Sequence, residues 1–205
     1  MIKKKRLFIL LIPLSVQLLY LPINRLASGG IKPEIPLDQL MPLWPVWAVP
    51  YLLAIPLWIF GFLWAGLVMD DKQFMTLVVS STMAMCIGMI CFIVFPTFVE
   101  RPTVTGNDWA SKLLRWIYAN DEVYNAVPSG HAYISTILAL AWRRWKPDLS
   151  WLWGAILVII LLSTLFTRQH YLIDLVIGIG LGVTAYCIVY QVSPRVCYYT
   201  TQKKA

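Results

Sequence analysis

Long apolar runs dominate this chain, and they limit its fold more than any other feature. The runs lie at about 6–23, 47–69, 74–95, 129–142, 151–167 and 170–192. A helix needs about 20 apolar residues to cross the hydrocarbon core of a bilayer, which is about 30 Å thick. Six such helices would use about 120 residues, which leaves too few of the 205 for a second folded domain. The sequence therefore predicts an all-α protein, a single membrane domain over residues 1–205 built as an integral membrane bundle of six transmembrane helices.

The composition excludes a water-soluble globule. Of the residues, 59% are apolar and 13% are charged, whereas soluble domains are nearer half apolar and a quarter charged. The net charge of +7 comes largely from short basic runs beside apolar segments, such as 3–6 and 143–144. This placement favours contact with anionic lipid over binding of nucleic acid. The four cysteines have no metal-type spacing, so we expect small apolar side chains and no disulfide framework.

Basic residues also predict the orientation of the bundle. The first run follows Lys and Arg as a signal peptide does, but it is long and a cleavage at Ala27 would put Arg25 where a small residue belongs. We therefore expect an uncleaved first span. A cytoplasmic N-terminus then places 11 of the 17 Lys and Arg on the inner side, including every basic run. The prediction is an integral protein of the cell membrane with both termini in the cytoplasm and an outer loop at 97–128.

That outer loop contains a predicted helix. Asn107 or Asp108 can cap it, and it would run to about Tyr118. Its apolar residues recur at spacings of three and four, namely Trp109, Leu113, Trp116 and Ile117. A short amphipathic helix with two Trp is typical of the membrane interface. A loop helix that packs on the protein is the alternative, and the sequence leaves both open.

The two histidines mark where chemistry could occur. His131 and His170 each stand at the outer start of a predicted span, so they should lie at the same membrane face. Asp174 follows His170 by four residues, which would put both on one side of a helix. A carboxylate at that depth is costly unless it is paired or faces water. The spacing predicts a His-Asp pair in which the carboxylate orients the imidazole.

A candidate anion site accompanies the histidines. His131 ends the sequence Pro128-Ser129-Gly130-His131, and its helix would begin there with free N–H groups and the positive end of its dipole facing outward. Arg101, followed by Pro102, adds a guanidinium suited to bidentate contact with phosphate. The acidic residues outside the membrane do not cluster as Mg²⁺ or Zn²⁺ ligands do. We therefore expect no metal and no cofactor.

Together these residues resemble the type 2 phosphatidic acid phosphatase (PAP2) superfamily of histidine-dependent lipid phosphatases. The motifs of that superfamily are Lys-x6-Arg-Pro, Pro-Ser-Gly-His and Ser-Arg-x5-His-x3-Asp. The chain matches them in order with Arg101-Pro102, with 128–131, and with His170-x3-Asp174. It departs from them at Val94, where the motif has Lys, and at Thr164, where it has Arg. The form of 168–174 is closer to the branch that contains inositol phosphorylceramide and sphingomyelin synthases.

The resemblance implies a mechanism and a role for each residue. His170, oriented by Asp174, would attack phosphorus and form a phosphohistidine, and His131 would protonate the leaving alkoxide. Phosphate oxygens would be held by four groups: Arg101, Ser129, Gly130 and, in place of the missing Arg, Arg168. The implied reaction is hydrolysis of a phosphomonoester or pyrophosphate of a lipid in the membrane, at a site on the extracytoplasmic face.

Two other functions remain open at this point. In the first, the same histidines transfer a phospho-head group to an alcohol, as an inositol phosphorylceramide synthase does. In the second, the protein is a transporter without enzymatic activity, and the His-Asp pair relays protons. The gathering of polar residues at one face favours chemistry on a lipid over transport. The sequence names neither the lipid nor the oligomeric state.

Overall fold

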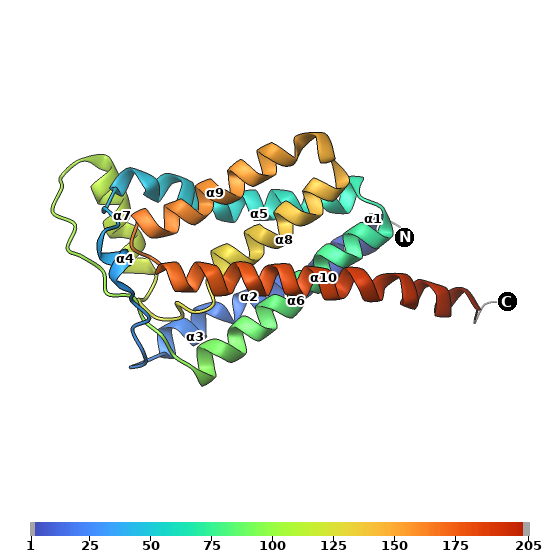
Figure 1. Cartoon of the computed structure of the whole chain (residues 1–205), viewed down its shortest axis with the longest axis horizontal. Helices are drawn as coiled ribbons and strands as arrows, with labels where there is room; N and C mark the ends of the chain where they lie inside the picture. The colour runs from blue at the N-terminus through green and yellow to red at the C-terminus, as the bar shows by residue number, and fades with distance from the viewer. Residues whose placement is uncertain (1–2, 203–205) are drawn as a thin grey trace.

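The computed structural model describes residues 3–202 and is built of helices joined by loops (Figure 1). The N-terminal span is interrupted at Leu10 and Leu19 and so consists of three helices. These are α1 (Lys3–Ile9), α2 (Leu11–Leu18) and α3 (Tyr20–Leu26). The remaining elements are α4 (Pro36–Gln39), η1 (Pro45–Trp47), α5 (Ala48–Val68), α6 (Asp71–Val94), α7 (Trp109–Asn120), α8 (Gly130–Trp145), η2 (Pro147–Leu149), α9 (Ser150–Phe166) and α10 (Leu172–Gln202). The described residues form an all-α membrane bundle.

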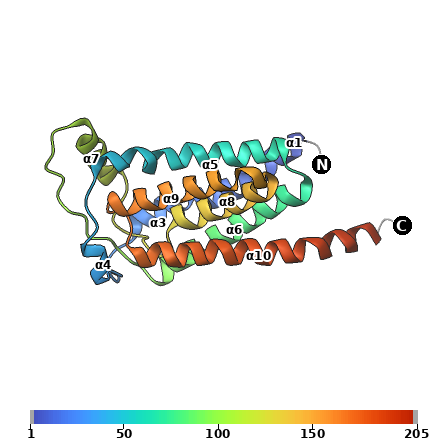
Figure 2. The same ribbon diagram turned by 45° about the horizontal axis from the view of Figure 1, so that its top comes forward.

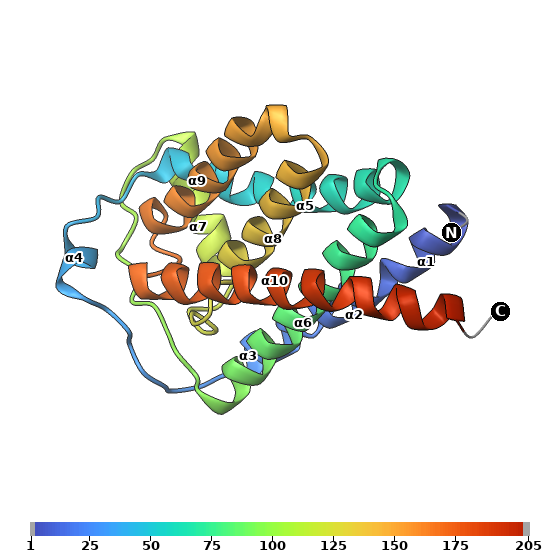
Figure 3. The ribbon, with the colours of Figure 1, turned by 45° about the vertical axis from the view of Figure 1, so that its right-hand side comes forward.

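Five segments among the described residues are long and apolar enough to cross a bilayer, one fewer than the sequence predicts. They are Lys5–Leu26, Pro45–Val68, Asp71–Val94, Pro147–Phe166 and Leu172–Val192. The predicted span at 129–142 corresponds to α8, which has only 16 residues. It packs against α5, α6, α9 and α10 in the middle of the bundle (Figure 3). Because other helices cover α8, it does not need the length of a helix that faces lipid.

Small residues bring α8 and α10 into close contact. A Cβ atom at Gly178 would lie 2.7 Å from Cβ of Ala132 and 2.8 Å from the carbonyl oxygen of Ser129. A Cβ atom at Gly182, one turn further along α10, would lie 2.9 Å from the carbonyl oxygen of Tyr133. Glycines spaced by four residues allow two membrane helices to approach closely. This approach places the start of α10 beside the start of α8, and the two histidines belong to these two starts.

The outer-loop helix is present as α7. The Asp108 side chain accepts hydrogen bonds from the N–H groups of Ala110 and Ser111, both at 3.0 Å, and thereby caps it. Its buried face includes Leu114 and Ile117, which pack with residues of α5. Trp109 and Trp116 are 62% and 55% exposed. The helix therefore packs on the protein on one side and presents two indole rings on the other, and its place at a membrane interface stays a prediction.

The candidate site and the two ends of the chain lie at opposite ends of the bundle. In Figure 1, α1 begins and α10 ends at the same side, whereas α7 and the start of α10 lie at the other. Figure 2 shows α10 running along one edge of the bundle and continuing beyond the other helices. The loops that carry Arg101 and His170 therefore face away from the end at which both termini lie.

Candidate active site

His170 and Asp174 form the pair that their spacing predicts. Nδ1 of His170 lies 3.2 Å from Oδ2 of Asp174, and the same oxygen accepts the N–H of Tyr171 at 2.8 Å. His170 itself precedes the first residue of α10, so the two residues are not on one helix as the sequence suggested. The loop still brings them together, because the N–H groups of Gln169 and His170 both bond to the carbonyl oxygen of Thr164. Two contacts thus fix His170: its backbone N–H bonds to Thr164, and its Nδ1 contacts Asp174.

His131 lies opposite His170. The centroids of their rings are 6.1 Å apart, and the His131 ring stacks on Tyr51 with centroids 4.4 Å apart. Trp58 contacts the His131 ring as well, with centroids 5.0 Å apart. Nε2 of His131 is buried and has no hydrogen-bond partner among the described residues. The structure therefore brings the two histidines together. The unpaired nitrogen Nε2 belongs to the His131 ring, which Tyr51 and Trp58 contact.

Ser129 has a structural position at the start of α8. Its side chain caps the helix by accepting the N–H of Ala132 at 3.3 Å, and its own N–H donates to the carbonyl oxygen of Asp174 at 3.1 Å. The side chain is completely buried. Gly130, the next residue, lines the cavity that both histidines line. The cap therefore joins the starts of α8 and α10, and the backbone at Gly130 is the part that faces the cavity.

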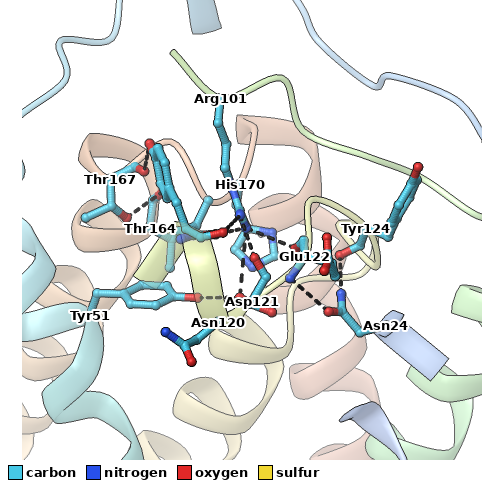
Figure 4. Close-up of polar contacts among 12 residues, drawn as sticks. Asn24, Tyr51, Arg101, Asn120, Asp121, Glu122, Tyr124, Thr164, Thr167 and His170 are labelled. Atoms are coloured by element: carbon cyan, nitrogen blue, oxygen red, sulfur yellow. Dashed lines mark hydrogen bonds and ion pairs between the residues drawn. The ribbon is translucent and has the colours of Figure 1, made fainter. Parts of the chain in front are cut away.

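Arg101 reaches the same cavity from the loop after α6 (Figure 4). Its guanidinium donates to the carbonyl oxygens of Asp121 at 2.6 Å and Glu122 at 3.0 Å, and to Oε1 of Gln169. It also lies over the ring of Tyr118, 4.8 Å from the centroid. These contacts fix the charge beside His170. A guanidinium held in this way can bind phosphate without first becoming ordered.

Arg168 points away from the cavity, in contrast to the sequence expectation. Its backbone is left-handed, with φ of 51°, and its guanidinium donates to the carbonyl oxygens of Asp38, at 2.6 Å, and of Met41. It does not line the cavity. The left-handed turn directs residue 168 toward the segment 38–41 and the next side chain, Gln169, toward Arg101. The guanidinium of Arg168 therefore binds the loop at 38–41 and is not brought together with the two histidines.

Sequence reasoning missed Asp121, which follows α7. Its Oδ1 accepts the hydroxyl of Tyr20 at 3.0 Å, and its Oδ2 accepts that of Tyr51 at 3.3 Å. Oδ2 also lies 4.0 Å from the Arg101 guanidinium. Burial raises the pKa of the Asp121 carboxyl, and the charge of Arg101 opposes this rise. No short motif marks the residue, because its partners lie far away in the chain.

The described residues that line the cavity include one cationic side chain, two histidines and two acidic side chains. Arg101 is the one Lys or Arg among the described residues that line the cavity, whereas Asp121 and Glu122 are acidic. Among the side chains that the structure describes, those of residues 5–192, no three His, Cys, Asp or Glu are grouped as metal ligands would be. The arrangement can bind an anion at Arg101 and at the start of α8, and it can transfer protons and form a covalent bond at the histidines.

One known protein family matches most of the chain. A family model described as the PAP2 superfamily matches residues 37–188. The matched region contains Arg101, the segment 128–131, His170 and Asp174. No curated protein and no solved structure gives a significant match. The family model covers most of the chain, and the protein therefore belongs to the PAP2 superfamily.

Proposed function

We propose that this integral membrane protein is a lipid-phosphate phosphatase that works through a phosphohistidine at His170. The observation that carries the proposal is the position of the two histidines. Their ring centroids are 6.1 Å apart at one cavity, and Asp174 contacts the His170 ring at Nδ1. A reacting phosphate between the rings would have a nucleophile on one side and a proton donor on the other.

The contact with Asp174 determines which nitrogen attacks. If Nδ1–H of His170 donates to Asp174, the lone pair lies on Nε2. Nε2 then attacks phosphorus, the N–P bond forms, and the bond from phosphorus to the lipid oxygen breaks. The leaving alkoxide takes a proton from His131. In the second step water loses a proton to His131 and attacks phosphorus, which breaks the N–P bond and releases phosphate. The two steps restore both histidines.

Charge on the phosphate oxygens would be balanced by Arg101 and by the N–H groups at the start of α8. The 16-residue helix α8 begins at Gly130, so its positive dipole end faces the cavity. Donors that are already in place stabilise the charge that develops in the transition state. The role that the sequence suggested for Arg168 is not part of this proposal, because its guanidinium binds the segment 38–41.

The shortage of cations favours a second candidate. With Val94, Thr164 and Gln169 where basic groups could lie, Arg101 balances little more than one negative charge. A phosphodiester carries one negative charge, whereas an ionised phosphomonoester carries two. Transfer of a phospho-head group from a lipid diester to an alcohol would use the same histidines, with the alcohol in place of water. This is the reaction class of the inositol phosphorylceramide synthase-like branch.

We also propose that the protein lies in the cell membrane with its active site on the extracytoplasmic face. The starts of α8 and α10, beside which the two histidines lie, are at the end of the bundle opposite to the start of α1 and the end of α10. The basic run 3–6 and the pair 143–144 belong to that other end, and such runs favour the cytoplasmic side.

Purified protein and a panel of lipids test the proposed function. The panel contains phosphatidate, phosphatidylglycerophosphate, a polyprenyl pyrophosphate and diesters, each with and without alcohol acceptors. We expect release of phosphate from at least one lipid, and an acid-labile phosphoprotein that His170→Ala cannot form. A new head-group diester with little free phosphate would favour the transferase. Absence of product and of phosphoprotein with every lipid would contradict both.

A further inference from the structure

The cavity at the histidines continues far into the bundle. It has a volume of about 500 Å³. Its polar end is lined by Arg101, Asp121, His131 and His170, and the rest is lined almost entirely by apolar side chains of α2, α5, α6 and α8. Gln17 is the one polar side chain of α2 among these residues. The described cavity is therefore amphipathic, with a polar head and a long apolar body.

The length of the whole cavity, polar end included, is close to the depth of one membrane leaflet. Residues of α5 line the cavity from Tyr51 to Leu63. These residues are twelve steps apart, which corresponds to about 18 Å at 1.5 Å per residue. One leaflet contributes about 15 Å to a hydrocarbon core of about 30 Å. A lipid whose phosphate lies at the histidines could thus place its head group and one hydrocarbon chain along the length of the cavity.

The cavity opens sideways between α2 and α5. Its floor is buried and includes Met85, Phe92 and Ile134, which are 5% exposed or less. Its rims are exposed: Leu14 of α2 and Ile59 of α5 are 50% and 56% exposed. A buried floor between two exposed apolar rims describes a groove that faces the surrounding lipid. An apolar surface of this kind binds hydrocarbon.

Polar contacts hold the N-terminal span at its two ends, beyond the apolar body of the groove. At one end Arg6 donates to the carbonyl oxygens of Gly66, at 3.0 Å, and Met69, at 2.7 Å. At the other end Asn24 donates to the carbonyl oxygen of Tyr124 and accepts the N–H of Glu122, both at 3.0 Å. These anchors place α2 beside α5 while the space between them stays open for a ligand.

We propose that this groove binds one hydrocarbon chain of the lipid whose phosphate reacts at His170. The chain reaches the groove from the bilayer, between α2 and α5, and lies between Leu14 and Ile59. The proposal rests on the proposed function for the position of the phosphate. It adds that the N-terminal span is part of the substrate site and that chain length determines how well a substrate binds. Short-chain phosphate esters would lose these apolar contacts.

Two substitutions that fill the groove test the proposal. Ile59→Trp and Leu14→Trp narrow it from opposite rims, and Val158→Trp is the matched control, because Val158 of α9 is 52% exposed and lies outside the groove. The substrates are a long-chain phosphatidate and a water-soluble short-chain phosphatidate. We expect kcat/KM for the long-chain lipid to fall about tenfold in both variants, because an overfilled apolar site loses binding. The short-chain lipid should change by less than about threefold.

A binding measurement separates this proposal from the proposed chemistry. Long-chain and short-chain alkyl phosphonates cannot lose their phosphorus group, so their effect on the melting temperature reports binding alone. In the unaltered protein and in His170→Ala, we expect the long-chain phosphonate to raise the melting temperature more. Ile59→Trp should remove that difference and Val158→Trp should keep it. Such a result without turnover of any lipid would support the binding of a hydrocarbon chain in the groove and contradict the proposed phosphatase activity. Equal effects of both chain lengths, or equal losses for both phosphatidates, would overturn the groove.

Discussion

Nδ1 of His170 lies 3.2 Å from Oδ2 of Asp174, and the carboxylate that makes this contact is completely buried. A buried carboxylate is expensive unless it is paired. Its partners here are an imidazole and the N–H of Tyr171. The pair therefore determines the direction of the imidazole ring and stabilises positive charge on it, two properties that a nucleophilic histidine requires.

Asp174→Asn should reduce turnover and leave folding almost unchanged. Asn keeps the shape of the side chain but stabilises an imidazolium less well, and the equivalent change in a serine-protease triad costs about 10⁴ in rate. We expect a loss on the order of 10²–10⁴ in kcat. Turnover and the melting temperature in detergent are measured on one preparation. A folded Asp174→Asn protein with full turnover would show that the pair is structural.

The two histidines should differ in their response to the leaving group. His170→Ala should abolish turnover and the phosphoprotein, because the nucleophile is lost. His131→Ala should slow the reaction of an alkyl ester by about 10²–10⁴ and should retain activity toward an aryl phosphate, whose leaving group needs no proton. The check is kcat for both ester types in each variant. Equal losses for the two ester types in His131→Ala would show that His131 is not the acid.

Asp121→Asn should strengthen the binding of phosphate. Oδ2 of Asp121 lies 4.0 Å from the Arg101 guanidinium and competes with any anion there. We expect inorganic phosphate to inhibit the variant at about tenfold lower concentration. Glu122→Gln is the control, since the Glu122 side chain is exposed and solvent screens its charge.

Inhibition by phosphate should depend on pH through Asp121. Burial raises the pKa of Asp121, although Arg101 opposes the rise, and Tyr20, Tyr51 and His170 also face the carboxyl. Phosphate should bind the unaltered protein better below this pKa, where Asp121 is neutral, and worse above it. The inhibition constant for phosphate should therefore rise with pH in the unaltered protein, as Asp121 ionises. The same rise should be absent in Asp121→Asn. An identical pH dependence in both would contradict a role for Asp121.

Arg101 and Arg168 should have different roles. Arg101→Ala should lower kcat/KM by about 10²–10³, because a fixed donor to the phosphate is lost. Arg168→Ala should lower the free energy of unfolding by about 1–3 kcal/mol, because charged hydrogen bonds to the segment 38–41 are lost. Its turnover per folded molecule should stay within about threefold of the unaltered protein. Loss of phosphate inhibition in a stable Arg168→Ala protein would place Arg168 in the phosphate site.

Cysteine labelling in intact cells should show which side of the membrane the site faces. After the native cysteines are replaced, single cysteines are introduced in the segments 103–127 and 143–149. An impermeant thiol reagent should label the first segment and miss the second, because the basic run favours the cytoplasm. Labelling of 143–149 alone would show that the bundle has the opposite orientation and that the active site faces the cytoplasm.

The sequence by itself determined the membrane class, the all-α fold and the pairing of His170 with Asp174. Hydropathy reports how apolar a segment is, and a four-residue spacing predicts neighbouring side chains on a helix. The pair forms although His170 lies just before α10, because the carbonyl oxygen of Thr164 holds the backbone at 169 and 170. Hydropathy does not distinguish a helix that faces lipid from one that other helices cover. For this reason the sequence predicted six spans, whereas α8 lies inside the bundle with 16 residues.

Only the tertiary structure decided which polar groups reach the cavity. Arg168 and Gln169 are neighbours, yet the left-handed backbone at 168 directs one toward the segment 38–41 and the other toward Arg101. Asp121 enters the site because Tyr20 and Tyr51, far away in the chain, both donate to it. Such contacts form only when helices pack together. That packing depends on the shapes of side chains that are far apart in the sequence. Local patterns contain no information on those separations. They therefore located the histidines, Asp174 and Arg101, but not the contacts of Arg168 or the place of Asp121.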